Sequence, residues 1–279
     1  MTQGRTIMNY DLLFLDVDGT LKQEPNEISE VNKEAVTRAC CAGKKVFIAS
    51  GRNKNLILNT VQELQLNSYG NSYTVALNGA HIIDNYTGET LHTVPISTQL
   101  TYRLFLKAYE LDVSCHVYTE NLVYFNFNDE QFSWYKKGGC DCRFVDMGSP
   151  DLGLEEVPLK FFLHTEDRDK LERFKEEMHE VTKESLNAEF SSTYSLEYTS
   201  IHASKGLGME FICNLFGKSA SEAVAAGDGE NDISMLTRAG LGIAMKNALD
   251  SVKAVADTVT ERTCSEDGVT EIIHKYLLV

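Results

Sequence analysis

The sequence predicts an α/β fold in which a doubly wound parallel sheet is interrupted by an inserted α+β domain. Short apolar segments at 12–15, 45–49 and 74–77 alternate with helical stretches, which is typical of parallel strands joined by crossover helices. This alternation stops after residue 84 and resumes near residue 204. Between these points, strand-like segments lie only a few residues apart, which favours antiparallel pairing.

The individual elements follow in order. Ser29 is suited to cap a helix that Gly43 ends, and a second helix is expected from about 53 to 64. The inserted part is expected to contain, in order, a helix at 97–111, strands at 113–118 and 122–127, a short helix at 129–137, a strand at 159–165, a charged helix at 167–184 and a strand pair at 188–192 and 194–199. After it come helices at 204–216, 249–256 and 266–277 and strands at 223–226, 241–245 and 258–260.

These elements divide the chain into two parts. We expect a discontinuous core formed by 1–84 and 196–279, and an inserted α+β domain at 85–195. Ligands of open parallel sheets bind beyond the carboxyl ends of the strands. The functional site is therefore expected at that edge of the core.

Polar residues follow the first three core strands at this edge. Asp16 and Asp18 follow the first strand, Ser50 and Gly51 the second, and Asn78 the third. In an extended chain, residues i and i+2 point to the same side, so the two carboxylates would face one spot. At ~5 Å and an effective dielectric constant of ~20, they repel by roughly 3 kcal/mol. The pattern indicates either a divalent cation or proton chemistry, or a polar turn that ends the strand.

A second acidic pair follows a later strand. Asp228 and Asp232 are one helical turn apart and can face the same point. An oxygen-rich cluster of this kind suits Mg²⁺ better than zinc. The Ser50 hydroxyl, the Gly51 N–H group and Lys205 at a helix start are suited to bind phosphate.

Composition restricts the partners. The 279 residues carry 26 basic and 41 acidic side chains, a net charge of −15, which argues against nucleic acid or an anionic membrane surface. The chain has no 20-residue apolar stretch, and Met1–Asn9 lack an apolar signal core. Seven cysteines without a disulfide-like framework favour a reducing compartment, so a cytoplasmic protein is expected. The expected state is a monomer or a small homo-oligomer.

Four ordered motifs resemble those of the haloacid dehalogenase (HAD) superfamily, with its Rossmann-like core. They are Asp16-Val-Asp-Gly-Thr20, Ser50-Gly-Arg52, Lys205-Gly206 and Gly227-Asp-Gly-Glu-Asn-Asp-Ile-Ser-Met235. Asn78-Gly79-Ala80 and Glu266-Asp-Gly268 resemble its Cof-type phosphatases in particular. In that subgroup an α/β cap is inserted between the second and third motifs, which is where the sequence places its α+β domain.

The resemblance implies a role for each motif residue. Asp16 would attack phosphorus to form an aspartyl-phosphate, and Asp18 would transfer protons to the leaving group and from water. Mg²⁺ would be held by the Asp16 carboxylate, the Asp18 backbone carbonyl and Asp228, with Asp232 orienting ligands. The remaining site residues are expected to bind substrate or phosphate, with the task of Arg52 left open: Ser50, Gly51, Arg52, Asn78, Lys205 and Asn231.

The function implied is Mg²⁺-dependent hydrolysis of a small phosphorylated metabolite, with a sugar phosphate as the main expectation. Two alternatives are a sugar phosphomutase and a regulatory protein that binds phosphate without turnover. The seven histidines are scattered, and packing or surface positions are favoured for them. Aromatic residues such as Tyr118 and Tyr124 alternate along expected strands and are interpreted as sheet packing.

Overall fold

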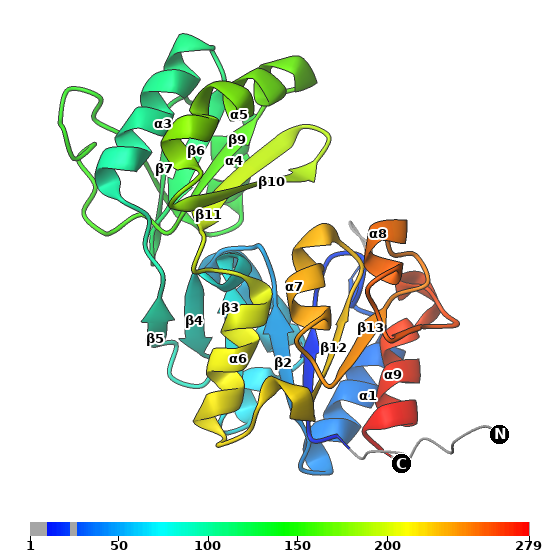
Figure 1. Cartoon of the computed structure of the whole chain (residues 1–279). Coiled ribbons are helices and arrows are strands. Elements are labelled where there is room, and N and C mark those ends of the chain that lie inside the picture. Colours follow the sequence, from blue (N-terminus) through cyan, green and yellow to red (C-terminus); the bar gives the residue numbers. More distant parts are fainter. Residues whose placement is uncertain (1–9, 23–26, 279) are drawn as a thin grey trace.

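Two β-sheets organise the computed structural model, which describes residues 10–22 and 27–278 (Figure 1). The larger sheet has eight strands in the order β14-β13-β12-β1-β2-β3-β4-β5, and the smaller has six in the order β10-β11-β9-β6-β7-β8. Residues 1–9, on which the expectation about a signal sequence rests, lie outside the described residues. In the part that is described, no helix has the length and apolarity needed to cross a membrane.

The larger sheet is parallel from β14 to β3, whereas β4 and β5 are added in antiparallel pairing. Every residue of β1 is buried, because the sheet is covered on both faces. The strands are β1 (Leu12–Leu15), β2 (Lys45–Ala49), β3 (Tyr73–Ala76), β4 (His81–Asp84), β5 (Thr90–Thr93), β12 (Ala223–Gly227), β13 (Leu241–Ala244) and β14 (Thr258–Val259).

Helices of the core pack on this sheet and on one another. Helix α1 contacts α9, and α6 contacts α7 as well as β2 and β3. The Ser29 side chain accepts a hydrogen bond from the Asn32 N–H and caps α1, as predicted. The helices are α1 (Glu30–Cys41), α2 (Lys54–Glu63), α6 (Lys205–Leu215), α7 (Ile233–Leu236), α8 (Asp250–Lys253) and α9 (Gly268–Tyr276), with 3₁₀ turns η1 (Leu66–Ser68), η2 (Leu77–Gly79), η3 (Ala220–Glu222), η4 (Glu230–Asp232) and η5 (Cys264–Glu266).

The smaller sheet is antiparallel except where β7 pairs with β8. Its strands are β6 (Ser114–Tyr118), β7 (Leu122–Phe125), β8 (Asp141–Phe144), β9 (Lys160–His164), β10 (Leu186–Ser192) and β11 (Ser195–Ser200). The accompanying helices are α3 (Thr98–Glu110), α4 (Glu130–Lys137) and α5 (Arg168–Thr182). Helices α3 and α5 pack together over this sheet, which has a hydrophobic core of its own (Figure 1). We call residues 97–200 the cap.

The boundaries of the inserted domain, as strand pairing defines them, lie a little later in the chain than the limits of 85 and 195 predicted from the sequence. Strand β5 pairs with β4 and so belongs to the larger sheet. Strand β11 pairs with β9 and β10 and so belongs to the smaller one. The overall α/β class with an inserted α+β cap is confirmed.

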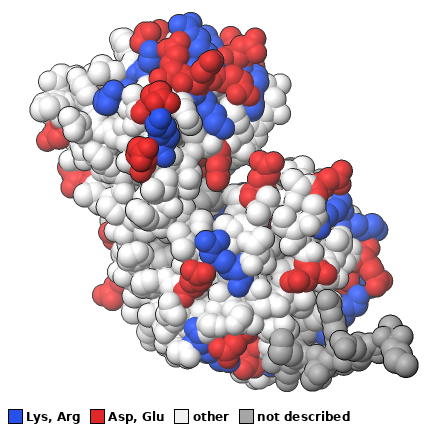
Figure 2. Space-filling model, in the orientation of Figure 1, with Lys and Arg blue, Asp and Glu red and all other residues white. Residues whose placement is uncertain are grey.

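Charges of both signs are interspersed over the outer end of the cap (Figure 2). Along α5, Arg168 pairs with Glu172 and Arg173 with Glu177, each one helical turn apart. The excess of acidic residues therefore does not form one continuous patch on this face.

Candidate active site

Strand register places the polar strand ends at one edge of the larger sheet. Leu15 of β1 lies beside Ile48 of β2 and Ala226 of β12, and each of these strands ends there or one residue later. Asp16 comes directly after β1, and its N–H group donates to the carbonyl of Ala226. The sheet therefore fixes the backbone of Asp16 beside the loop that carries Asp228.

Lys205 lies between two carboxylates beneath this edge. Its Nζ is 2.6 Å from Asp16 Oδ1 and 2.6 Å from Asp232 Oδ1, and its side chain is completely buried. Burial alone lowers the pKa of Lys205, but the attraction of Asp16 and Asp232 outweighs it and raises that pKa above its usual value. Lys205 is therefore a fixed positive charge that neutralises part of the acidic cluster and orients Asp16.

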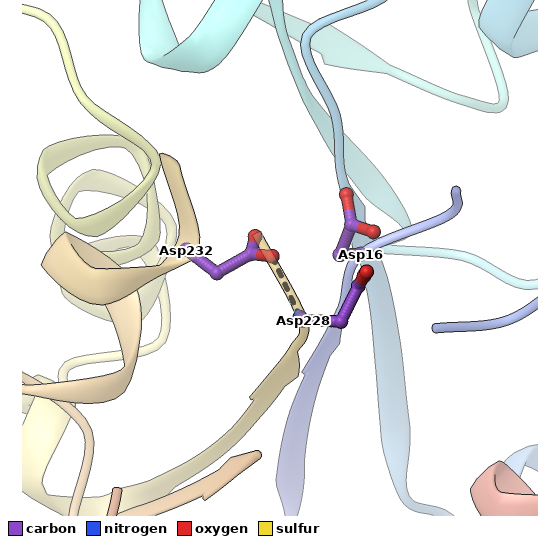
Figure 3. Close-up of side chains that lie close together, drawn as sticks. All are labelled: Asp16, Asp228 and Asp232. Atoms are coloured by element: carbon purple, nitrogen blue, oxygen red, sulfur yellow. Dashed lines mark hydrogen bonds between the residues drawn. The ribbon is translucent and has the colours of Figure 1, made fainter. Parts of the chain in front are cut away.

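The loop after β12 holds Asp232 in place from its other side. Asp232 Oδ2 accepts hydrogen bonds from the N–H groups of Asp228, at 2.9 Å, and Gly229, at 3.0 Å. A Cβ at Gly227 would lie 2.3 Å from Asp232 Cγ, so this close approach requires glycine. Figure 3 shows Asp16 and Asp228 at neighbouring strand ends, with Asp232 approaching from the opposite side.

Asp16, Asp228 and Asp232 lie close enough together that they could hold a cation. One oxygen of each lies within 4.8 Å of the others. Burial and the Asp232 charge raise the pKa of Asp16 well above its ordinary value despite Lys205, and burial, with Asp232, raises that of Asp228 to about 6. Three carboxylates with one ammonium carry excess negative charge, which a hard divalent cation would offset. Lys205 and two N–H groups already use the oxygens of Asp232, whereas Asp16 and Asp228 each have an oxygen that could serve as a direct ligand.

The side chain of Asp18 stands apart from these three acids. Both of its oxygens are held by Arg52, at 2.8 Å from Nε and 2.6 Å from Nη2, and it is half exposed. A bidentate contact of this kind fixes the orientation of both groups. The structure thus gives Arg52, whose task the sequence left open, a defined partner.

A turn after Asp18 supports Asp228. Gly19 has a φ of +87°, and a Cβ there would lie 2.1 Å from Asp228 Oδ2. The Thr20 hydroxyl donates to Asp228 Oδ1 at 2.9 Å, and Asn247 Nδ2 donates to the Gly19 carbonyl at 2.7 Å. Sequence analysis did not assign Thr20 or Asn247 to the site, although Thr20 lies within the first motif.

The loops after β2 and β3 meet beside this turn. Ser50 is buried, and its carbonyl accepts a hydrogen bond from the N–H of Asn78, which has a left-handed φ of +54°. Asparagine tolerates this conformation better than most residues. In the side chain of Asn78, Oδ1 accepts a hydrogen bond from Asn231 Nδ2 at 3.2 Å, and Nδ2 donates one to Glu197 Oε2 at 3.0 Å. Asn78 thereby joins the core loops to the cap.

We call the edge of the larger sheet that carries Asp16, Asp228 and Asp232 the acidic edge. A cavity of about 450 Å³ lies between this acidic edge and the cap. Eight predicted site residues line it: Asp16, Asp18, Ser50, Gly51, Arg52, Asp228, Asn231 and Asp232. Lys205 and Asn78 are not among its lining residues; Lys205 lies below it, and Asn78 lines a neighbouring cavity of about 640 Å³.

The cap contributes lining residues that sequence analysis missed. Lys160 and Glu197 form a buried pair at 2.6 Å, and Lys160 also donates to the Gly51 carbonyl at 3.0 Å. A lysine within the otherwise apolar segment 159–163 was the available signal. Aromatic lining comes from Tyr118, Trp134, Tyr135 and Phe162. Tyr118 packs in the sheet, as interpreted from the sequence, and in addition faces this cavity.

Comparisons with known proteins identify the family. A family model described as haloacid dehalogenase-like hydrolase matches residues 13–273. The putative phosphatase YxeH of Bacillus subtilis is 27% identical over 96% of this chain and 99% of its own. The 5-amino-6-(5-phospho-D-ribitylamino)uracil phosphatase YcsE of the same species is 27% identical over 100% of both chains. The solved HAD subclass IIB sugar phosphatase BT4131 superposes with a TM-score of 0.80 at 26% identity, covering 95% of this chain and 98% of its own. The chain therefore belongs to the haloacid dehalogenase-like hydrolases and is a phosphatase-type enzyme of that family.

Proposed function

We propose that the enzyme hydrolyses the phosphate monoester of a small phosphorylated metabolite through an aspartyl-phosphate (acyl phosphate) at Asp16. The observation that supports this most strongly is the position of Asp16, which lines the cavity while Lys205 holds its Oδ1 at 2.6 Å. Lys205 thus orients the carboxylate of Asp16 toward the cavity, where an oxygen of this group can attack phosphorus. The bond from phosphorus to the leaving oxygen then breaks. Water subsequently attacks the same phosphorus, releasing inorganic phosphate and free Asp16.

Asp18 is suited to both proton transfers, and Arg52 to controlling them. In the structure both carboxylate oxygens of Asp18 are held by Arg52. A carboxylate at this position is suited to accept a proton from the attacking water. To protonate the leaving oxygen, an oxygen of Asp18 must turn from the guanidinium to the leaving group. A phosphoryl group in the cavity competes with Asp18 for Arg52. We infer that substrate phosphate draws Arg52 away and leaves Asp18 free to act as an acid.

Asp16 and Asp228 would hold a divalent cation, with Asp232 and Lys205 fixing the geometry around it. When bound, Mg²⁺ would neutralise charge on the carboxylates and on the phosphoryl oxygens. The all-oxygen donor set favours Mg²⁺ over softer metals. Ser50 and the backbone of Gly51 line the cavity and are proposed to bind phosphoryl oxygens, with Asn231 beside them.

A polyhydroxylated leaving group, and a sugar phosphate in particular, fits the cap side of the cavity. The buried pair of Lys160 and Glu197 offers one donor and one acceptor for hydroxyl groups. Tyr118 and Phe162, which line the cavity, offer apolar surface for the C–H side of a sugar ring. One similar protein is named a sugar phosphatase, and another is named for a phosphoribityl substrate.

Phosphate release tests this proposal. Wild type, Asp16→Asn and the control Asp11→Asn are assayed on sugar phosphates, nucleotides and phosphorylated cofactors, with Mg²⁺ and with chelator. Asp11 pairs with Lys44 at the surface, so its variant should retain activity. Asp16→Asn should lose turnover, since an amide is not a nucleophile of useful strength. Near-normal turnover by Asp16→Asn would reject the assignment, and phosphate transfer that requires a sugar bisphosphate would favour a mutase.

A further inference from the structure

A line of three hydrogen-bonding side chains runs through the cap toward the cavity. His116 of β6 is completely buried, and its Nε2 lies 2.9 Å from the Tyr118 hydroxyl. The Tyr118 hydroxyl in turn contacts that of Tyr135 from α4. Both tyrosines line the cavity that Asp16 also lines, whereas His116 lies behind them among aromatic rings.

The environment of His116 determines the direction of these hydrogen bonds. Its Nδ1 has no hydrogen-bond partner among the described residues. A buried N–H without a partner is rarer and more costly than a buried acceptor without one. The proton of the neutral ring therefore belongs on Nε2, which donates to Tyr118. Burial supports this state, because it lowers the pKa of His116 well below its ordinary value and raises that of Tyr118 well above.

The direction continues to the cavity. Because Tyr118 accepts the proton of His116, its own O–H is directed to the oxygen of Tyr135. The O–H of Tyr135 then has no acceptor within this line of three side chains, and Tyr135 is a lining residue of the cavity. A hydroxyl that already accepts a hydrogen bond is polarised as a donor.

We propose that Tyr135 is a specificity-determining residue that donates a hydrogen bond to an oxygen of the leaving group, and that His116 is a positioning residue that sets this polarity through Tyr118. The inference rests on the proposed function and assigns a recognition task to the cap wall. The Tyr135 hydroxyl selects leaving groups that present a hydroxyl or ring oxygen at this point over those that present only C–H groups.

The test compares substrates with and without such an oxygen. The probes are glucose 6-phosphate, mannose 6-phosphate, ribose 5-phosphate and phenyl phosphate, whose leaving group carries no oxygen besides the ester. Tyr135→Phe should lower kcat/KM about tenfold for the best sugar phosphate of this panel, the size of one lost neutral hydrogen bond, and leave phenyl phosphate within about twofold. Tyr198→Phe is the matched control, because Tyr198 is a buried cap tyrosine outside the cavity.

Variants of His116 separate positioning from simple packing. His116→Phe removes the donor, so Tyr135 can donate to Tyr118 instead, and the same selective loss should appear. His116→Gln retains an N–H donor and should restore most of the discrimination. In the double variant His116→Phe/Tyr135→Phe, the second change should add little to the first.

A turnover-independent measurement completes the test. In an Asp16→Asn background, adding Tyr135→Phe should weaken binding of the same sugar phosphate and leave binding of inorganic phosphate unchanged. Equal losses on sugar and phenyl phosphates, or no loss on either, would overturn the inference. Equal behaviour of His116→Phe and His116→Gln would overturn the positioning role. Failure of the wild type to release phosphate from any ester would instead contradict the proposed function.

Discussion

Replacing Lys205 by methionine tests whether the acidic edge depends on one buried charge. Lys205 Nζ lies 2.6 Å from an oxygen of Asp16 and 2.6 Å from one of Asp232. At an effective dielectric constant of about 20, Coulomb's law gives about 6 kcal/mol for each contact at that distance. Dehydration of the three ions cancels most of this gain. Removing only the cation leaves two carboxylates buried beside each other, and we expect the free energy of unfolding to fall by about 3–5 kcal/mol.

A second lysine provides a control with the same chemistry at the surface. Lys275 Nζ lies 3.0 Å from Glu261 and 2.9 Å from Glu271, but its side chain is 45% exposed. Water screens these contacts, so Lys275→Met should cost less than about 1 kcal/mol. Urea unfolding of both variants, followed by far-UV circular dichroism in the presence of chelator, measures the two costs.

The comparison is decisive because both lysines bridge two carboxylates and differ mainly in burial. A loss for Lys205→Met no larger than that for Lys275→Met would refute the claim that burial makes this charge structurally necessary. Phosphatase activity of Lys205→Met should also fall strongly, since Asp16 loses the contact that orients it.

Two further predictions follow from backbone geometry and from a buried imidazole. Gly19→Ala should abolish activity, because its Cβ would lie 2.1 Å from Asp228 Oδ2. Gly43→Ala is the control, because Gly43 has a similar φ (+84° against +87°) but no atom within 4 Å of the added Cβ. Steady-state kinetics and urea unfolding of both variants separate the clash from the backbone strain, and an active Gly19→Ala would show that the turn can move. Burial lowers the pKa of His81 to about 4, so the unfolded chain binds a proton that the folded chain does not between about pH 6.5 and 4. Its contribution to stability is present above pH 6.5 and lost as the pH falls through that window, by up to about 3 kcal/mol. Urea unfolding across this range should show a weaker pH dependence for His81→Gln than for the exposed control His274→Gln, and equal slopes would contradict the assignment.

The acidic edge could be predicted from the sequence because its signals are local. Asp16 follows a short apolar strand, and Asp228 stands between two glycines at the end of another. Parallel pairing brings such strand ends together whatever the details of packing. The position of Lys205 is different: the sequence placed it at a helix start, suited to phosphate, whereas the structure buries its Nζ between two carboxylates. That contact depends on how α6 packs against the loop after β12.

The cap side of the site was beyond sequence reasoning. Lys160 and Glu197 come from different strands, and their pairing depends on the register of β9 with β11. The direction of the hydrogen bonds at Tyr135 depends on a histidine ring whose second nitrogen has no partner among the described residues. Periodicity indicates which side chains are buried, but it does not indicate which of two sheets or cavities they face. For the same reason, the limits of the inserted domain could not be placed from alternating segments alone.

The insertion of the cap between β1 and its neighbour β12 has a consequence for biosynthesis. Leu12–Leu15 pair with Ala223–Ala226, so one flank of this central strand has no backbone partner until the ribosome has translated the whole intervening cap. The strands of the cap pair with one another, within 114–200, so the cap can fold before β12 is available to pair with β1. This strand edge therefore lacks its partner for most of synthesis, and the catalytic site can be completed only after the residues up to Asp232 have been translated.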